Sequence, residues 1–240
     1  GGPALDVRVL AGHPIVTADA VTTDDASRAR IALTIGTVDV EPGSRLRALR
    51  LRGSEQRFAL ERGAVAARVD APPRVFVVET PSAVATDLGC AYTLRVDSAG
   101  NGELHVTAGV VELALAGRLA IVPIGARAEL RAGEGPGTPT VDDAPAALRR
   151  ALDRFDFAGG GPDDLTAVLA AARSADGLTL WHLLARAPAE LRGRVYDRLA
   201  ALAPPPPGVT REGILRLDAK MLDAWWDYVP GTVWRGRPTK

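Results

Sequence analysis

The side chains that most often carry out chemistry are spread thinly along this sequence. The three histidines, His13, His105 and His182, stand far apart, and the single cysteine, Cys90, has no base beside it in sequence that would lower its pKa. No zinc-protease helix motif, nucleophile elbow, Walker loop or dinucleotide fingerprint occurs. We therefore expect no catalytic residue, no cofactor and no metal, with Cys90 a buried inert thiol and His182 a buried ring whose hydrogen bonds are satisfied.

Three pairs of adjacent carboxylates could in principle work as general acid and base. They are Asp24-Asp25, Asp142-Asp143 and Asp163-Asp164. All three stand at expected turns or helix starts, where carboxylates accept hydrogen bonds from free backbone amides. We interpret them as capping or solvated groups, and a hydrolase built from dispersed carboxylates is the alternative.

Five arginines, Arg45, Arg47, Arg50, Arg52 and Arg57, form the most prominent stripe of charge, and the first four are candidate partner-binding residues. Arg45 and Arg47 share one strand face, whereas Arg50 and Arg52 have the opposite parity, which predicts a bulge or bend near Ala48-Leu49. The stripe could dock an anionic partner. It could equally be a solvated face, or a sheet edge that charge protects from unwanted pairing.

Aromatic residues concentrate near the C-terminus, where Trp225, Trp226, Tyr228 and Trp234 stand close together. Aromatic side chains dominate the energetics of many binding surfaces, which makes Trp225 and Trp226 candidate partner-binding residues. In the alternative interpretation they attach the last helix to the rest of the chain.

Composition narrows the class of protein. The chain has 240 residues, 47% of them hydrophobic, and its 29 basic residues balance 29 acidic ones. Nucleic acid and anionic membranes are not expected as partners, because both attract an excess of positive charge. No apolar run approaches the roughly 20 residues of a membrane helix. The sequence reaches a strand pattern by Leu5, so we expect any membrane anchor to precede Gly1 in the full-length protein.

The chain must fold in two halves with different periods. From Leu5 to about Leu130, short runs alternate apolar and polar residues, which is typical of half-buried strands, and turn-forming segments separate them. One of these, at Asn101-Gly102, suits a tight hairpin. We predict a mainly β domain over residues 1–132, an irregular solenoid-like or sandwich-like stack of short antiparallel strands.

A Gly/Pro-rich stretch follows, and we predict a linker without regular structure over residues 133–143. Residues 144–240 then show helical periodicity and should form a small α-helical subdomain. Pro162 should open one helix, Asp176 should cap the next, Pro188 should start another, and the last should begin near Asp218. Helices this short must pack on one another or on the β domain.

An ordered series of strand motifs resembles the FecR family. Arg74-Val75-Phe76-Val77-Val78-Glu79-Thr80 followed by Leu88-Gly89-Cys90-Ala91-Tyr92 is similar to its central R-P-F-x-V-x-T and L-G-T-x-F motifs. The flanking strands at residues 36–40, 60–65 and 106–113 also fit, so the resemblance covers about residues 16–130. Val75, Cys90 and Tyr92 replace the usual proline, threonine and phenylalanine.

The resemblance implies a binding and signalling module rather than an enzyme. Members of this family are the extracytoplasmic parts of membrane-anchored anti-sigma regulators or envelope sensors, which implies a periplasmic or other extracytoplasmic location and a protein partner in the cell envelope. A structural envelope protein that assembles with copies of itself is the alternative, and the sequence leaves the oligomeric state open. The matched positions expected in the core are Phe76, Val78, Leu88, Tyr92, Val111 and Leu113.

Overall fold

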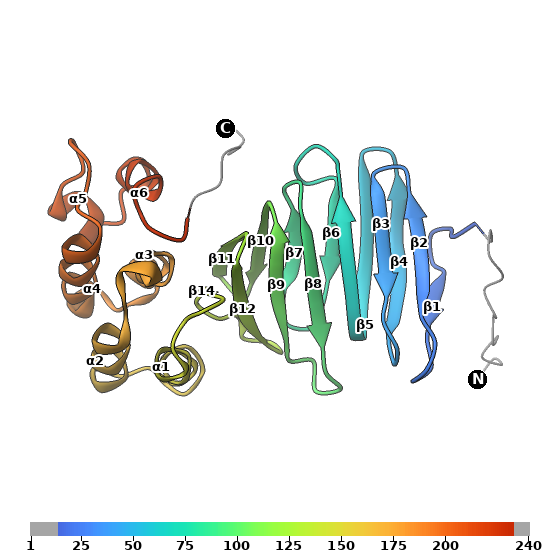
Figure 1. Cartoon of the computed structure of the whole chain (residues 1–240), viewed down its shortest axis with the longest axis horizontal. Helices are drawn as coiled ribbons and strands as arrows, with labels where there is room; N and C mark the ends of the chain where they lie inside the picture. Colours follow the sequence, from blue (N-terminus) through green and yellow to red (C-terminus); the bar gives the residue numbers. More distant parts are fainter. Residues whose placement is uncertain (1–13, 233–240) are drawn as a thin grey trace.

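The computed structural model of the protein describes residues 14–232. Figure 1 shows an elongated molecule in which strands stand side by side along the long axis, with helices gathered at one end and the first strands at the other. The predicted fold class, a mainly β N-terminal part followed by a small helical part, is confirmed. The strand expected at residues 5–9 lies outside the described residues.

The strands form two sheets that share one long strand. The first sheet has the order β1-β4-β5-β6-β7-β10-β11, and the second runs β2-β3-β5-β8-β9-β12, with β13 and β14 both paired to β12. All neighbours are antiparallel except β5 and β6. The strands are β1 Ala20–Thr22, β2 Ala29–Leu33, β3 Gly36–Val40, β4 Arg45–Arg52, β5 Glu55–Val69, β6 Phe76–Glu79, β7 Val84–Asp87, β8 Ala91–Val96, β9 Gly102–Ala108, β10 Val110–Leu115, β11 Arg118–Pro123, β12 Ala126–Arg131, β13 Gly135–Pro136 and β14 Thr140–Val141.

The shared strand β5 changes sheets at a glycine. Its first half pairs with β4 and β6, and from Gly63 onward it pairs with β3 and β8. Gly63 has φ +88°, and a Cβ there would lie 2.2 Å from the Ser44 Oγ. That hydroxyl accepts a hydrogen bond from the Ala64 amide at 2.8 Å, so only glycine allows the close approach that ties the two sheets together.

Alternating side chains from both sheets build one hydrophobic core. The Phe58 and Phe76 rings meet inside it, with centroids 5.7 Å apart. Of the six predicted core positions, five are buried, namely Phe76, Val78, Tyr92, Val111 and Leu113. The prediction for Leu88 is wrong, because this residue is only half-buried and the inward position of the preceding strand is taken by Asp87.

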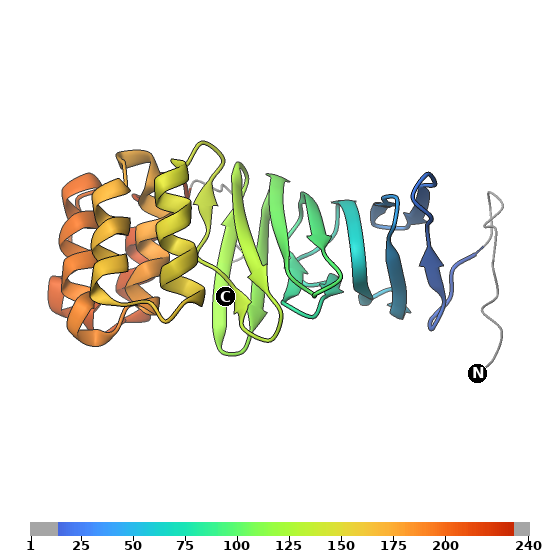
Figure 2. The same ribbon diagram turned by 90° about the horizontal axis from the view of Figure 1, so that it is seen from below.

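The helices form a second core at the end of the sandwich. Figure 2 shows them packed together as one group beyond the last strands. They are α1 Ala146–Phe157, α2 Pro162–Ala171, the 3-10 turn η1 Ser174–Asp176, α3 Gly177–Arg186, α4 Ala189–Leu202, α5 Arg211–Leu215 and α6 Ala219–Trp226. Within the described part of the chain, none of these helices has the length and apolar character needed to cross a membrane.

The predicted helix starts agree with the structure, with one change in detail. Pro162 opens α2, α4 begins directly after Pro188, and the Asp218 carboxylate caps α6 by accepting from two backbone amides. Asp176 precedes α3 as expected, but its carboxylate accepts from the backbone and side chain of Arg173 instead of from α3. Asp176 therefore stabilises the turn before the helix.

The Gly/Pro-rich stretch contains regular structure, contrary to the prediction. β13 and β14 pair with the two ends of β12, and the Gly137 amide donates to the Glu129 carbonyl at 2.7 Å. Residues 135–140 are all buried. Prolines fit here because a segment along a sheet edge needs few backbone donors, and glycines fit because they allow a close approach to the sheet. The division into domains at residues 132 and 143 stays a prediction.

Candidate interaction surfaces

Apart from the contact between His105 and Asp142, the candidate histidines and carboxylate pairs lie apart from one another in the part of the chain that the structure describes. Among residues 14–232, no three or more His, Cys, Asp or Glu side chains form a group that could hold a metal ion. His105 lies on the outer face of the second sheet, 2.9 Å from one Asp142 carboxylate oxygen, and Arg127 donates to the other oxygen. Asp24 accepts from two amides of its own turn, and Asp164 pairs with Arg154. His13 lies outside the described residues.

His182 is a structural residue, as predicted. Its Nε2 accepts a hydrogen bond from the Ile121 amide at 3.0 Å, and its Nδ1 lies 2.9 Å from the Leu178 carbonyl, to which it donates. This pattern requires the neutral ring. Burial lowers the pKa of His182 to about 3, which keeps the ring neutral.

Cys90 is buried, as predicted, and it has a partner that its immediate neighbours in sequence do not indicate. Its thiol donates to the Asp87 carboxylate at 2.8 Å and faces the Val110 carbonyl at 3.1 Å. Burial raises the pKa of the Cys90 thiol, which opposes formation of a nucleophilic thiolate. Burial also raises the pKa of Asp87 to about 6. Cys90 and the nearby Tyr92 both belong to the hydrophobic core, where the Tyr92 hydroxyl has no hydrogen-bond partner among the described residues.

The four candidate arginines all face outward on β4. The predicted bulge is present between Ala48 and Arg50, where the register with β5 shifts. The extra residue reverses the parity, so that Arg50 and Arg52 join Arg45 and Arg47 on one face instead of pointing away from them.

Glutamates on the neighbouring strands neutralise much of this face. Arg45 and Arg47 both pair with Glu61, at 2.8 and 3.2 Å. Arg50 and Arg57 both pair with Glu55, and these hydrogen bonds, that of Arg57 first, lower the pKa of the Glu55 carboxyl. The stripe is thus a ladder of alternating charges, and its role in binding an anionic partner stays a proposal.

The two candidate tryptophans do not form a surface. Trp225 is 0% exposed and Trp226 is 3% exposed. The Trp225 indole N–H donates to the Ala203 carbonyl at 3.1 Å, and the Trp226 ring meets the Trp181 ring edge-on at 4.7 Å. The candidate partner surface at these residues is therefore wrong, because both rings attach α6 to the helical core and the sandwich. Tyr228 is exposed, and Trp234 lies outside the described residues.

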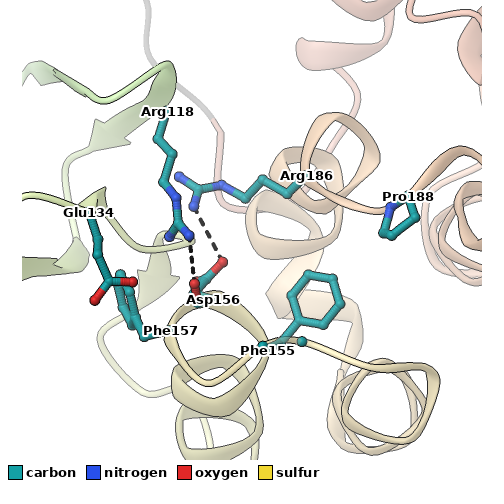
Figure 3. Close-up of a pocket in the computed structure, with 9 residues that line it drawn as sticks. Arg118, Glu134, Phe155, Asp156, Phe157, Arg186 and Pro188 are labelled. Atoms are coloured by element: carbon teal, nitrogen blue, oxygen red, sulfur yellow. Dashed lines mark hydrogen bonds and ion pairs between the residues drawn. The ribbon is translucent and has the colours of Figure 1, made fainter.

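An open pocket of about 340 Å³ lies where the sandwich meets the helices, lined in part by Arg118, Asp156 and Arg186. Figure 3 shows both guanidinium groups pointing at Asp156. Arg118 donates to the Asp156 carbonyl at 2.7 Å, and Arg186 donates to its carboxylate at 3.3 Å. The same carboxylate accepts from the Thr138 amide and hydroxyl. These bonds join β11, α1 and α3 at a structural junction, and the buried Arg118 Nη1 atom has no hydrogen-bond partner among the described residues.

The C-terminal edges of both sheets are covered. On β11, the Ile121 amide donates to His182 and the Leu119 carbonyl accepts from Arg186 at 3.2 Å. These two side chains lie one turn apart on α3, so a single helix occupies two backbone groups on the outer side of β11. β13 and β14 cover β12 in the second sheet. We call this region the closed end.

The opposite edges are not covered within the described residues. β1 pairs only with β4, and β2 pairs only with β3. Figure 1 places both strands at the end of the sandwich farthest from the helices. A strand with one unpaired edge can accept a further strand from another chain. We call this region the open end.

Comparison with known proteins agrees with this fold. Residues 19–112 match the family model described as FecR protein, so the chain contains a FecR-like domain, as its motifs predicted. Two crystal structures of a candidate anti-sigma factor from Parabacteroides distasonis ATCC 8503 are similar to the chain, each at 16% identity with a TM-score of 0.46. Each alignment covers 55% of this chain and 63%, less than two thirds, of that protein. No curated protein matches the chain.

Sequence reasoning missed the groups that cover the closed end. The sequence did not indicate a role for Arg186 or Asp156, because each stands alone among ordinary helix residues. The spacing of His182 and Arg186 by four residues was the available signal, since it places both on one helix face. Nothing in the sequence indicated that this face would meet a strand edge.

Proposed function

We propose that this chain is a non-enzymatic, extracytoplasmic binding module of a signalling regulator, and that its partner is another protein of the cell envelope. The observation that carries the proposal is the FecR match over residues 19–112. Proteins with this domain act as membrane-anchored anti-sigma regulators or envelope sensors.

The positions of the family-motif residues in the fold support a binding role. Phe76 and Val78 from the first motif and Tyr92 from the second are buried in the sandwich core. Residues selected for packing specify a shape, and function then depends on the surfaces that the shape presents. At the junction pocket, Arg118 donates to the Asp156 carbonyl and Arg186 to the Asp156 carboxylate, so these groups hold parts of the fold together.

The location and the regulatory role can be tested separately in cells that make the full-length protein. In spheroplasts, added protease should digest this part of the chain while a cytoplasmic control protein stays intact. Deletion of the gene should change the transcript levels of a defined set of genes, and the wild-type gene should restore them. Protection from protease would contradict the location, and unchanged transcripts would contradict the signalling role.

Self-assembly is the second candidate, and the open end is the observation that favours it. Two uncovered strands could pair with the same strands of another copy. Light scattering after size exclusion should then show a mass that increases with protein concentration. A constant monomer mass would exclude assembly through these edges.

A further inference from the structure

We propose that the free edge of β2 is the place where a partner strand adds to this domain, and that the strand alternates acidic with apolar side chains. This inference rests on the proposed function, because it assigns the partner-binding surface of that module. It depends on the pairing of β2, the direction of its backbone groups, and the side chains on its two faces.

The fold leaves a choice of two edges, and β2 is the better one. At the closed end, α3, β13 and β14 already occupy the backbone groups that a partner would need. At the open end, β1 has three residues, whereas β2 has five. A longer edge offers more main-chain hydrogen bonds, which supply the affinity in strand addition.

Hydrogen bonds on β3 determine which β2 groups are free. The Glu41 amide donates to the Ala64 carbonyl and the Asp70 amide donates to the Ile35 carbonyl, so Ile35 and Glu41 bond toward β5. Alternate residues of a strand bond to opposite neighbours, so Val38 and Val40 bond toward β2.

The register of β2 and β3 then assigns each residue of β2. Ile31 and Ala29 stand opposite Val38 and Val40 and use their backbone groups inside the sheet. The intervening residues, Arg30 and Ala32, therefore direct their N–H and C=O groups to the uncovered side. A partner strand would bond to these two residues.

The outer face of β2 selects acidic side chains. The Arg28 and Arg30 side chains are 74% and 69% exposed. Each already pairs with a carboxylate on the side of β2 that faces β3: Arg28 with Glu41 at 2.9 Å and Arg30 with Asp39 at 2.5 Å. An acidic residue on an added strand would continue this alternation of charge across the sheet.

The same charges disfavour a second copy of this chain as the occupant. Antiparallel pairing of two β2 edges would gather the Arg28 and Arg30 side chains of both copies on one face. Like charges on adjacent strands destabilise pairing. A heterologous strand with acids at alternate positions avoids this repulsion.

The inner face of β2 selects apolar side chains. Ile31 is buried, but Ala29, Leu33 and the adjacent Ile35 are only partly buried where they pack against the core. Apolar residues on the inner face of an added strand would cover these groups. The acidic residues then occupy the alternate, outward positions.

A pair of synthetic peptides tests the assignment with the full chain. One fluorescent peptide alternates Val with Glu, and its match has Lys in place of every Glu. Fluorescence anisotropy should show saturable binding of the Glu peptide, at least about tenfold tighter than the Lys peptide. Equal affinity for the two peptides, or no saturable binding of the Glu peptide, would overturn the proposal.

Proline substitutions at the two open edges provide matched variants. Ala32→Pro removes an amide that points to the free side of β2, and should weaken Glu-peptide binding about tenfold or more. Ala20→Pro makes the same change on β1 and should not alter binding. The backbone hydrogen bonds of Asp19 and Thr23 point toward β4, so the Ala20 amide points outward. Unaltered binding by Ala32→Pro would show that the strand adds elsewhere.

Two further measurements, hydrogen exchange and light scattering, identify the edge and the occupant independently. In the wild-type chain, the Glu peptide should slow hydrogen exchange at the Arg30 and Ala32 amides and not at Ala20, which does not depend on any variant folding. A dimer in light scattering that Ala32→Pro abolishes would identify a second copy as the occupant and overturn the heterologous partner. If the peptide fails while the spheroplast and transcript experiments succeed, the edge assignment is wrong and the proposed function stands.

Discussion

The two ends of the β sandwich show how one fold treats the same structural problem in opposite ways. At the closed end, α3 satisfies β11 through His182 and Arg186, and the Gly/Pro-rich segment pairs with β12. Leu178 and Trp226 also extend from the helices into the main core. At the open end, β1 and β2 each have one neighbour among the strands that the structure describes.

The difference indicates what the helical part contributes. An uncovered strand invites pairing with any extended chain, and proteins usually block such edges. By covering two of the four edges, the helices and the preceding segment would limit strand addition to one end of the molecule. A binding module gains specificity when fewer edges are available to a partner.

The largest expected effect comes from removing the arginine that links the two parts at the closed end. Arg186 donates to the Pro136, Gly137 and Leu119 carbonyls and to Asp156. Arg186→Met leaves these acceptors and a buried carboxylate without their donor, and should cost about 3–5 kcal/mol in urea denaturation.

Arg211→Met is the matched control for this substitution, because Arg211 pairs with Asp197 on the exposed surface. Loss of such a pair should cost about 0–1 kcal/mol. Equal costs for the two variants would mean that Arg186 does not hold the closed end together.

A buried carboxyl within the sandwich should make the protein more stable in acid. The pKa of Asp87 is raised from 3.8 to about 6, so the folded state holds this proton more tightly than the unfolded state does. Its contribution is complete below pH 3.8 and is lost as the pH rises through 6, a change of about 3 kcal/mol. Asp87→Asn should flatten this part of the profile of unfolding free energy against pH, and an unchanged profile would contradict the assignment.

The closed end should respond to acid in the opposite direction. The pKa of His182 is lowered from 6.5 to about 3, so the unfolded state binds the proton more tightly. Its contribution is complete above pH 6.5 and decreases as the pH falls toward 3, by about 2 kcal/mol at pH 5.

His182→Gln isolates this contribution, because the difference between variant and wild type cancels the titration of Asp87. Urea denaturation at pH 7 and pH 5 should show a gap between the two proteins that narrows in acid. Parallel pH profiles would show that the His182 ring does not have to stay neutral to cover β11.

The smallest effect is a difference in amide protection between the two ends, with no change in the protein. The Ile121 amide donates to buried His182, whereas the Ala32 amide points to the uncovered side of β2. Hydrogen exchange followed by NMR should be roughly a hundredfold faster at Ala32 than at Ile121, because local openings differ in free energy across a structure. Equal protection would mean that the open end is covered after all.

Local patterns predicted most of the elements. Period-2 alternation identified the β half and five of the six proposed core residues, and helix starts at Pro162, Pro188 and Asp218 follow from cap and proline chemistry. The bulge in β4 could be predicted too, since a change in parity of charged residues requires an extra residue. These features depend on neighbours within a few positions, where sequence and geometry are directly related.

Other predictions failed because they depend on distant contacts. From sequence, Trp225 and Trp226 could form a partner surface or attach the last helix, and only their packing against Ala203 and Trp181 excludes the partner surface. The Gly/Pro-rich stretch looked like a linker, because nothing local shows that β12 has a free edge beside it.

The sequence alone determined a FecR-like β domain followed by helices, since alternation, turns and caps are encoded within short segments. Only the tertiary structure decided which strand edges are covered and which are open. An edge is defined by what lies next to it. The groups that cover β11 come from a helix much further along the chain, since Ile121 and His182 are 61 residues apart in sequence. Such a contact forms only when the whole core has assembled.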